Sequence, residues 1–132
     1  MEIRYVVDDR ALDAARFIAL ARRCWRRQEY DEARVAAALG RTLNVTAWQR
    51  DELVGCLRIL SDGCFFATIP EMMVAPERRR QGIGSKLLAL GREASPVPSI
   101  FFGAQPGNEP FFEANGAERS LQSYVLRNTP LT

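Results

Sequence analysis

The 132-residue sequence contains no histidine at all. This absence excludes nucleophile systems that need an imidazole base, such as Ser-His-Asp and Cys-His, and it excludes histidine-ligated zinc. Cysteine is scarce as well. Cys24, Cys56 and Cys64 are odd in number and form no Cys-x-x-Cys pair, which argues against a disulfide framework and a zinc cluster. We therefore expect no metal, and any catalytic proton transfer must use carboxylates, tyrosine, cysteine, water or backbone donors.

Long apolar runs are also missing. No stretch approaches the roughly 20 residues of a membrane span, and the N-terminus lacks the apolar core of a secretory signal. We therefore expect a cytoplasmic protein with no membrane partner. The net charge of +2 is too small to signal a general nucleic-acid binder, and the arginine cluster at 78–80 lacks interleaved aromatic residues. We expect no nucleic-acid partner.

The length predicts a single domain over residues 1–132. The apolar periodicity predicts a mixed sheet flanked by helices, an α/β (α+β) fold without the regular alternation of a doubly wound one. The predicted order is β-α-α-β-β-β-α-β-α-β. Its strands are 3–7, 43–49, 53–60, 64–74, 99–103 and 121–126, and its helical segments are 11–27, 32–39, 84–95 and a turn within 106–115.

The segment 69–88 predicts a buried strand, a tight loop and a helix that starts with two glycines. Exposed N–H groups at a helix N-terminus, together with the helix dipole, form an anion site. Gly82 and Gly84 let a ligand approach the backbone without a Cβ clash. Three cations lie close enough in sequence to add positive charge around a phosphate: Arg78, Arg80 and Lys86.

Two common phosphate loops do not fit this segment. The dinucleotide fingerprint requires a glycine where Leu87 stands, and the Walker pattern ends in Gly-Lys-Ser/Thr where this chain has Gly84-Ser85-Lys86. Instead, Val74-Ala75-Pro76 followed by Arg79-x-x-Gly82-x-Gly84 resembles the pyrophosphate motif of the GNAT superfamily, the acyl-CoA-dependent N-acyltransferases. Residues 111–117, Phe-Phe-Glu-Ala-Asn-Gly-Ala, are similar to that family's Phe-Tyr-Glu-Lys-x-Gly-Phe segment.

The resemblance covers nearly the whole chain, because the predicted element order matches too. It implies a mostly antiparallel central sheet and an N-acetyltransferase that moves an acetyl or other acyl group from acetyl-CoA to an amine. A backbone N–H at a strand bulge, that of Met72, would hold the oxyanion. The implied contacts are Met72, Met73 and Val74 for the pantetheine arm; Arg79, Arg80, Gln81, Gly82, Ile83, Gly84 and Ser85 for the pyrophosphate; and Asn108 with Phe111 or Phe112 near the sulfur.

An ammonium substrate must lose a proton before it attacks a thioester. Glu71 is the leading candidate base, because it is an acidic residue within an otherwise apolar strand. Pairing with an arginine, or shaping of the pocket, is the alternative reading. The family often protonates the leaving thiolate with a tyrosine, but Phe112 stands at the matching position and cannot donate a proton. Water, Tyr30 or Tyr124 would have to substitute.

The sequence contains no motif that identifies the acceptor. A small-molecule amine, a protein lysine or a protein N-terminus all remain open, and a homodimer is an expectation from the family alone. The missing hydroxyl at Phe112 also keeps a second function open, that of a non-catalytic acyl-CoA-binding or regulatory module.

Overall fold

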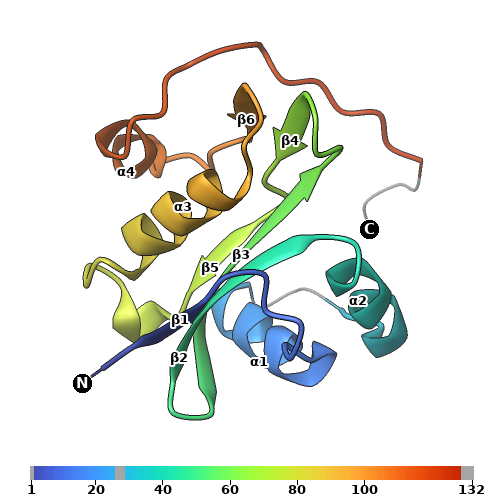
Figure 1. Cartoon of the computed structure of the whole chain (residues 1–132), viewed down its shortest axis with the longest axis vertical. Helices are drawn as coiled ribbons and strands as arrows, with labels where there is room; N and C mark the ends of the chain where they lie inside the picture. Colours follow the sequence, from blue (N-terminus) through green and yellow to red (C-terminus); the bar gives the residue numbers. More distant parts are fainter. Residues whose placement is uncertain (1, 26–28, 129–132) are drawn as a thin grey trace. The chain divides into compact units, whose positions relative to one another are not determined.

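The computed structural model describes residues 2–25 and 29–128. The chain divides into two compact units, Met1–Phe102 and Gly103–Thr132, which are described separately. The second unit contains one helix, α4 (Glu109–Ala114). The elements of the first unit, shown in Figure 1, are β1 (Arg4–Val6), α1 (Ala14–Cys24), α2 (Glu32–Leu39), β2 (Leu43–Gln49), β3 (Glu52–Ser61), β4 (Phe66–Thr68), β5 (Met72–Val74), the 3₁₀ turn η1 (Pro76–Arg78), α3 (Ile83–Ala94) and β6 (Ser99–Phe101).

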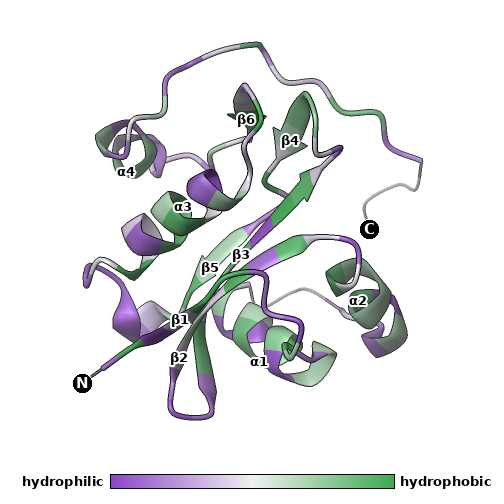
Figure 2. Cartoon of the chain, viewed as in Figure 1, coloured by the Kyte–Doolittle hydropathy of each residue, from purple (hydrophilic) through white to green (hydrophobic). Residues whose placement is uncertain are grey.

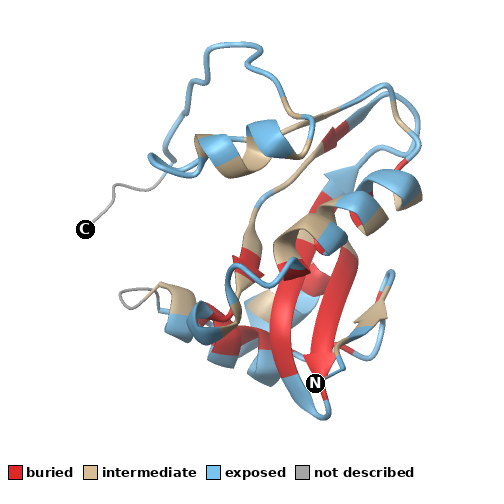
Figure 3. Cartoon of the chain, turned by 90° about the vertical axis from the view of Figure 1, so that its left-hand side faces the viewer, coloured by how far each residue is buried: buried red, intermediate tan, exposed pale blue. Residues whose placement is uncertain are grey.

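The strands of the first unit form one mixed sheet in the order β1-β2-β3-β4-β6, and β5 also pairs with β3. Every pairing is antiparallel except that of β4 with β6, which is parallel. The predicted mixed, mostly antiparallel sheet with flanking helices is therefore confirmed. Figure 3 shows that the long central strands are buried along most of their length.

The two long helices α1 and α3 cover opposite faces of β3. A Cβ added at Gly55 would lie 3.0 Å from Ile83 Cγ2, and one added at Gly91 of α3 would lie 2.6 Å from Leu57 Cδ2. From Gly55 onward, odd-numbered residues of β3 thus face α3. The guanidinium carbon of Arg58 lies 5.9 Å from the ring centroid of Phe17 in α1, so even-numbered residues face α1. Because α1 and α3 bury both faces of β3, much of this strand is coloured as hydrophobic in Figure 2.

The strand predicted over 64–74 is in fact two strands, because a bulge interrupts it. Thr68 pairs with Leu60 and Met72 pairs with Leu57, so four residue steps (72 − 68) oppose three (60 − 57). The extra residue lies within 69–71, which contains Pro70 and its missing backbone N–H. This bulge ends β4 and begins β5.

Two further sequence predictions are wrong. Residues 121–126 form no strand, although their apolar pattern predicts one; Tyr124 is 89% exposed. A strand needs an edge to pair with, and nothing in the described part of the chain pairs with this segment. Cys64, the first residue of the strand predicted over 64–74, is exposed and precedes β4. The single domain over 1–132 stays a prediction, and residues 26–27 of the expected first helix lie outside the described residues.

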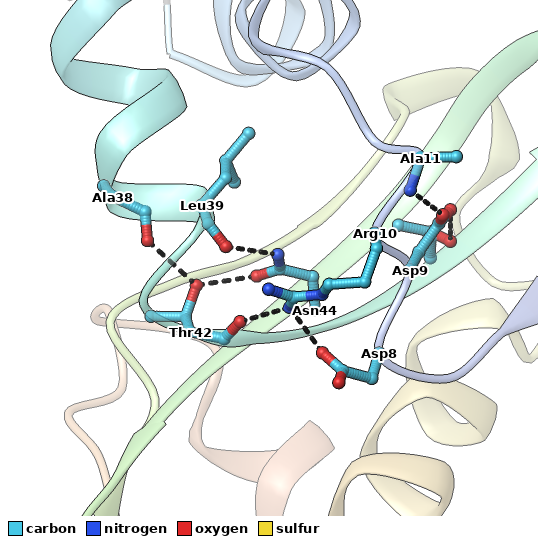
Figure 4. Close-up of polar contacts among 9 residues, drawn as sticks. Asp8, Asp9, Arg10, Ala11, Ala38, Leu39, Thr42 and Asn44 are labelled. Carbon is cyan, nitrogen blue, oxygen red and sulfur yellow. Dashed lines mark hydrogen bonds and ion pairs between the residues drawn. The ribbon is translucent and has the colours of Figure 1, made fainter.

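A buried carboxylate fastens the β1–α1 connection to the sheet. Asp9 is 6% exposed. Its Oδ2 accepts hydrogen bonds from Thr46 Oγ1 (2.7 Å) and Trp48 Nε1 (3.0 Å), and its Oδ1 accepts one from the Ala11 N–H (3.0 Å). A neighbouring network, drawn with Asp9 in Figure 4, ties the end of α2 to β2: Asn44 Nδ2 donates to the Leu39 carbonyl at 2.9 Å.

Replacing Asp9 with alanine should destabilise the fold. The change removes three hydrogen bonds and leaves buried donors on Thr46 and Trp48, so we expect a loss of about 2–4 kcal/mol in the free energy of unfolding. Urea unfolding followed by tryptophan fluorescence measures this loss. Asp51→Ala, at an exposed turn, is the matched control and should cost less than about 0.5 kcal/mol. Equal losses in the two variants would contradict the assigned role of Asp9.

Candidate functional site

The outer edge of β5 carries main-chain groups that no strand uses. The Ala75 N–H donates to the Val54 carbonyl (2.8 Å), and the Glu71 carbonyl accepts from the Arg58 N–H (3.2 Å). Backbone groups of alternate residues point to opposite edges of a strand, so Met72 and Val74 direct theirs away from β3. Among the described strands, none pairs with that edge. An extended ligand could therefore pair with β5 there, while the N–H and C=O of Met73 face β3.

The loop after β5 leads to a helix N-terminus that no side chain caps. Gly82 is the N-cap of α3 and has φ +85°, the first turn contains no acidic residue, and no side chain bonds to its amides. A Cβ added at Gly82 would meet no heavy atom within 4 Å, so the loop surface is open there. Arg80 also has a positive φ of 64°. The first-turn N–H groups are free, and the helix dipole is positive at this end. The N-terminus of α3 therefore has the geometry of an anion-binding site.

Side chains around the loop are partly occupied by other contacts. Arg79 Nε donates to the Val74 carbonyl at 3.2 Å, so its side chain returns to the β5 edge. Gln81 Nε2 donates to the Glu77 carbonyl at 3.5 Å. The carboxylate of Glu77 forms an ion pair with Arg23, which also lies 3.1 Å from Glu52 Oε2. Arg23 therefore pairs with an acidic side chain of η1 and ties α1 to the segment that precedes the glycine loop.

Glu71, the predicted base, lies in the bulge and forms a bidentate ion pair with Arg58. Glu71 Oε1 lies 2.5 Å from Arg58 Nε, and Oε2 lies 2.9 Å from Arg58 Nη2. Both side chains are largely buried, at 15% and 20% exposed for Arg58 and Glu71. The pairing that the sequence left as an alternative is thus present. Each carboxylate oxygen keeps lone-pair capacity outside the arginine fork, so the pair fixes Glu71 without blocking a further contact.

The C-terminal end of α1 also contacts this edge. Cys24 Sγ donates to the Val74 carbonyl at 3.6 Å, and burial raises the pKa of the Cys24 thiol, an effect that the Arg79 guanidinium partly opposes. Burial also raises the pKa of the Tyr30 phenol, and the negative charge of Glu71 raises it further.

The second unit holds the remaining predicted residues. Asn108 is the N-cap of α4, although its side chain makes no capping bond. The rings of Phe111 and Phe112 pack edge to face, 5.1 Å apart at 76°. Asn115 Nδ2 donates to the Phe111 carbonyl at 2.8 Å, which secures the end of this short helix. Contact of Asn108, Phe111 or Phe112 with a ligand in the first unit stays a prediction.

A separate cavity of about 720 Å³ lies between the start of α1, α2 and β2. Two of its buried polar side chains already have partners within the protein: Asp9 is held as described above, and Asn44 Oδ1 accepts from Thr42 Oγ1 at 2.7 Å. None of the predicted site residues lines this cavity. The β5 edge is the candidate site, because no described strand pairs with the outward main-chain groups of Met72 there.

Residues 2–25 and 29–128 contain no group of three or more His, Cys, Asp or Glu side chains that could hold a metal ion. In the same ranges, no helix is long and apolar enough to cross a membrane.

Comparisons with known proteins identify the class of protein that has this fold. The chain has the fold of a GNAT family acetyltransferase from Streptococcus pneumoniae (20% identity, TM-score 0.77, 96% of this chain and 100% of that one). The ribosomal-protein-alanine N-acetyltransferase of Brucella melitensis (19%, 0.72, 97% and 100%) shares it as well. So does the aminoglycoside N-acetyltransferase AAC(6')-Iy in complex with CoA (14%, 0.73, 96% and 95%).

The family itself follows from the sequence. Residues 40–116 match the model of the acetyltransferase (GNAT) domain, which is more than half of the chain. A search of curated proteins found no matching sequence. The chain belongs to the GNAT acetyltransferase family and is an acyltransferase by class, as the motif at 74–84 predicts.

The three cysteines should differ in their rates of alkylation, which tests the geometry of the edge. Alkylation requires the thiolate, so exposed Cys64 should react fastest at pH 7.5. Cys24 should react at least about tenfold more slowly, because burial raises its pKa, and its rate should climb as the pH rises. Buried Cys56 should react only after unfolding. Peptide mass spectrometry after iodoacetamide labelling measures the order; a Cys24 as reactive as Cys64 would contradict it.

Proposed function

We propose that this chain transfers an acetyl group from acetyl-CoA to the amine of a small molecule or a protein. One observation carries the proposal: the unpaired edge of β5 leads within a few residues into the uncapped N-terminus of α3. CoA has the complementary chemistry, since its pantetheine arm carries amide groups and its other part carries a pyrophosphate. AAC(6')-Iy, which shares the fold, is described in complex with CoA.

The residues at this edge fit CoA. Main-chain groups of Met72 and Val74 would bond to the pantetheine amides as a neighbouring strand does, with Met73 between them facing β3. Amides of the loop and first turn, from Arg79 to Ser85, would hold the pyrophosphate. Open space at Gly82 leaves room for a phosphate against the backbone. Arg79 would have to share the Val74 carbonyl or release it when the arm binds.

The acetyl group would lie at the bulge end of β5. The Met72 N–H points out of the free edge, which suits it to receive the negative charge that develops on the thioester oxygen. A backbone N–H held by the sheet costs no reorganisation as that charge appears. The same bulge carries Glu71, so the oxyanion donor and the candidate base are consecutive residues.

Glu71 would remove the proton from the acceptor amine, directly or through a water molecule. Its ion pair with Arg58 sets the position of the carboxylate and leaves one side of each oxygen for the amine. AAC(6')-Iy is described with a bisubstrate analog of CoA and acetylneamine, and the Brucella enzyme as an acetyltransferase of ribosomal-protein alanine. Both a small amine and a protein amine therefore remain proposals here.

The direct test is release of free CoA thiol that depends on an added amine, measured across a panel of small amines and peptides. A non-catalytic acyl-CoA-binding module is the second candidate, favoured by Phe112, which provides no hydroxyl where the family often has a tyrosine. Calorimetry would then show acetyl-CoA binding while no amine gives turnover above background. That result would overturn the catalytic proposal and keep the binding one.

Glu71→Gln should lower the rate of acetyl transfer while the affinity for acetyl-CoA stays within about twofold. Glutamine keeps the size and one hydrogen-bond acceptor for Arg58 but cannot take up a proton, so we expect a fall in kcat of about 10²-fold. Steady-state kinetics with calorimetry of acetyl-CoA binding separates the two effects. An unchanged kcat would remove Glu71 from the mechanism.

Gly82→Ala should weaken binding of CoA by about tenfold, because the added Cβ strains a residue at φ +85° and occupies the open space against the loop. Gly63→Ala is the matched control. Gly63 also has positive φ (78°) and open surroundings, but it lies in the turn between β3 and β4. Both variants should lose about 1 kcal/mol of stability, and only Gly82→Ala should lose affinity in calorimetry. Equal affinity in both would count against a phosphate at Gly82.

A further inference from the structure

We propose that the acceptor amine carries a carboxylate on its neighbouring carbon atom, as an α-amino acid does, and that Arg58 binds this carboxylate. Glu71 would receive the proton of the amine beside it. The proposal names the acceptor class of the proposed acetyl transfer and therefore rests on it. Arg58 would be the residue that determines acceptor specificity, since its guanidinium would contact the acceptor.

The guanidinium of Arg58 is held in one orientation by its neighbours. The Arg58 backbone N–H donates to the Glu71 carbonyl at 3.2 Å, while Nε and Nη2 donate to the two Glu71 carboxylate oxygens at 2.5 and 2.9 Å. The guanidinium carbon lies over the ring of Phe17 in α1, 5.9 Å from its centroid. A guanidinium fixed in this way loses little conformational freedom when it binds a further group.

Arg58 has a second pair of donors that the protein does not use. Glu71 occupies the edge formed by Nε and Nη2. The other edge, formed by Nη1 and the second N–H of Nη2, has no acceptor among residues 2–25 and 29–128. Within these ranges, Nη1 is also not one of the solvent-inaccessible polar atoms without a partner. Because two parallel N–H groups match the oxygens of a planar carboxylate, this edge can bind a second carboxylate beside that of Glu71.

A second carboxylate at this edge requires a positive charge near it. Two carboxylates that share one guanidinium repel each other, and a cation between them offsets the repulsion. The ammonium of an α-amino acid is such a cation, because one carbon atom separates it from its own carboxylate. Its nitrogen then lies next to Glu71, within reach of the proposed base. Met72, whose N–H would hold the thioester oxygen, follows Glu71 directly in the chain.

Other acceptor classes do not match both groups of the Arg58–Glu71 pair. A protein N-terminus has an amide in place of the carboxylate, and a lysine side chain has no carboxylate on the carbon next to its amine. Neither fills the second edge of the guanidinium. A polycationic amine requires excess negative charge, whereas the charge of Glu71 is balanced by that of Arg58. The pair therefore favours a small zwitterion over both a protein amine and a polyamine.

The transfer step balances for this acceptor. The ammonium gives one proton to Glu71, directly or through water, and the neutral nitrogen forms a bond to the acyl carbon. The C–S bond breaks and its electron pair goes to sulfur. The sulfur takes up one proton, and the nitrogen gives up its second proton as the amide forms. Glu71 then returns its proton to solvent, so one proton is released overall. The product keeps the carboxylate but has lost the ammonium, and repulsion from Glu71 favours its release.

Matched acceptors test the proposal on the wild-type protein. Release of CoA thiol would be measured at pH 8 for a panel of α-amino acids and for the amide of each. We expect kcat/KM for the preferred amino acid to exceed that for its amide by at least about 30-fold, the effect of a lost bidentate charged pair. The amide has the less basic amine, so without a carboxylate contact the amide would react faster. Amides accepted as well as amino acids would overturn the proposal and leave the proposed function standing. Absence of turnover with every amine would instead refute the proposed function.

Arg58→Lys tests the residue itself. Lysine keeps a positive charge beside Glu71 but lacks the second pair of parallel donors. We expect kcat/KM for the amino acid to fall by about 30-fold and that for its amide by less than about threefold. Arg10→Lys, at an exposed ion pair with Asp8, is the matched control and should keep the preference. Equal falls for both acceptors would show that Arg58 only positions Glu71 and would overturn the proposal. The comparison of acceptors on wild type decides the matter if Arg58→Lys does not fold.

A binding measurement gives the same comparison without turnover. Calorimetry with protein saturated with CoA should show the amino acid binding at least about 30-fold more tightly than its amide, and Arg58→Lys should remove the difference. Equal affinities in the wild type would overturn the proposal. Because this measurement does not depend on acetyl transfer, failure of the acceptor assignment and failure of the proposed function give different results.

Discussion

The bulge at residues 69–71 is the constraint on which the site depends. One extra residue between Thr68 and Met72 lets β4 continue beside β6, with the Ile69 N–H still bonded to the Phe101 carbonyl at 3.1 Å, while β5 keeps only β3 as a partner. Without the extra residue, residues 66–74 would form one regular strand. The residues on one side of the bulge would then each point to the opposite face of the sheet. The free edge, the outward Met72 N–H and the place of Glu71 all follow from this single insertion.

The C-terminal end of α1 contacts both parts of the candidate site, the segment before the glycine loop and the edge of β5. Arg23 bridges Glu52 and Glu77, which joins the β2–β3 turn to η1, and Cys24 contacts the Val74 carbonyl. These contacts come from consecutive residues on one helix, so the position of α1 sets both the glycine loop and the edge of β5. A shift of α1 on β3 would therefore move the anion site and the thioester end together.

The sequence predicted the parts of the fold that local pattern determines. The glycine loop, the helix at 32–39 and the element order, apart from the divided strand at 64–74 and the absent last strand, came from periodicity, capping residues and the spacing of Gly82 and Gly84. Sequence analysis did not predict the features that depend on strand register or on which segments lie side by side. The Arg58–Glu71 ion pair requires a residue on β3 to face one in a bulge, and no spacing rule gives that. Residues 121–126 have strand-forming side chains without a strand beside them, and propensity alone does not form one.

The proposed site uses main-chain groups, and the fold itself is shared with proteins only 14–20% identical to this chain. Backbone N–H groups at the β5 edge and the α3 N-terminus need a glycine and a bulge but few particular side chains. The chemistry beyond binding requires only a base and a donor to the sulfur, and either can come from any element that reaches the bulge. Loss of the hydroxyl at Phe112 is then compatible with catalysis, provided that another element supplies it.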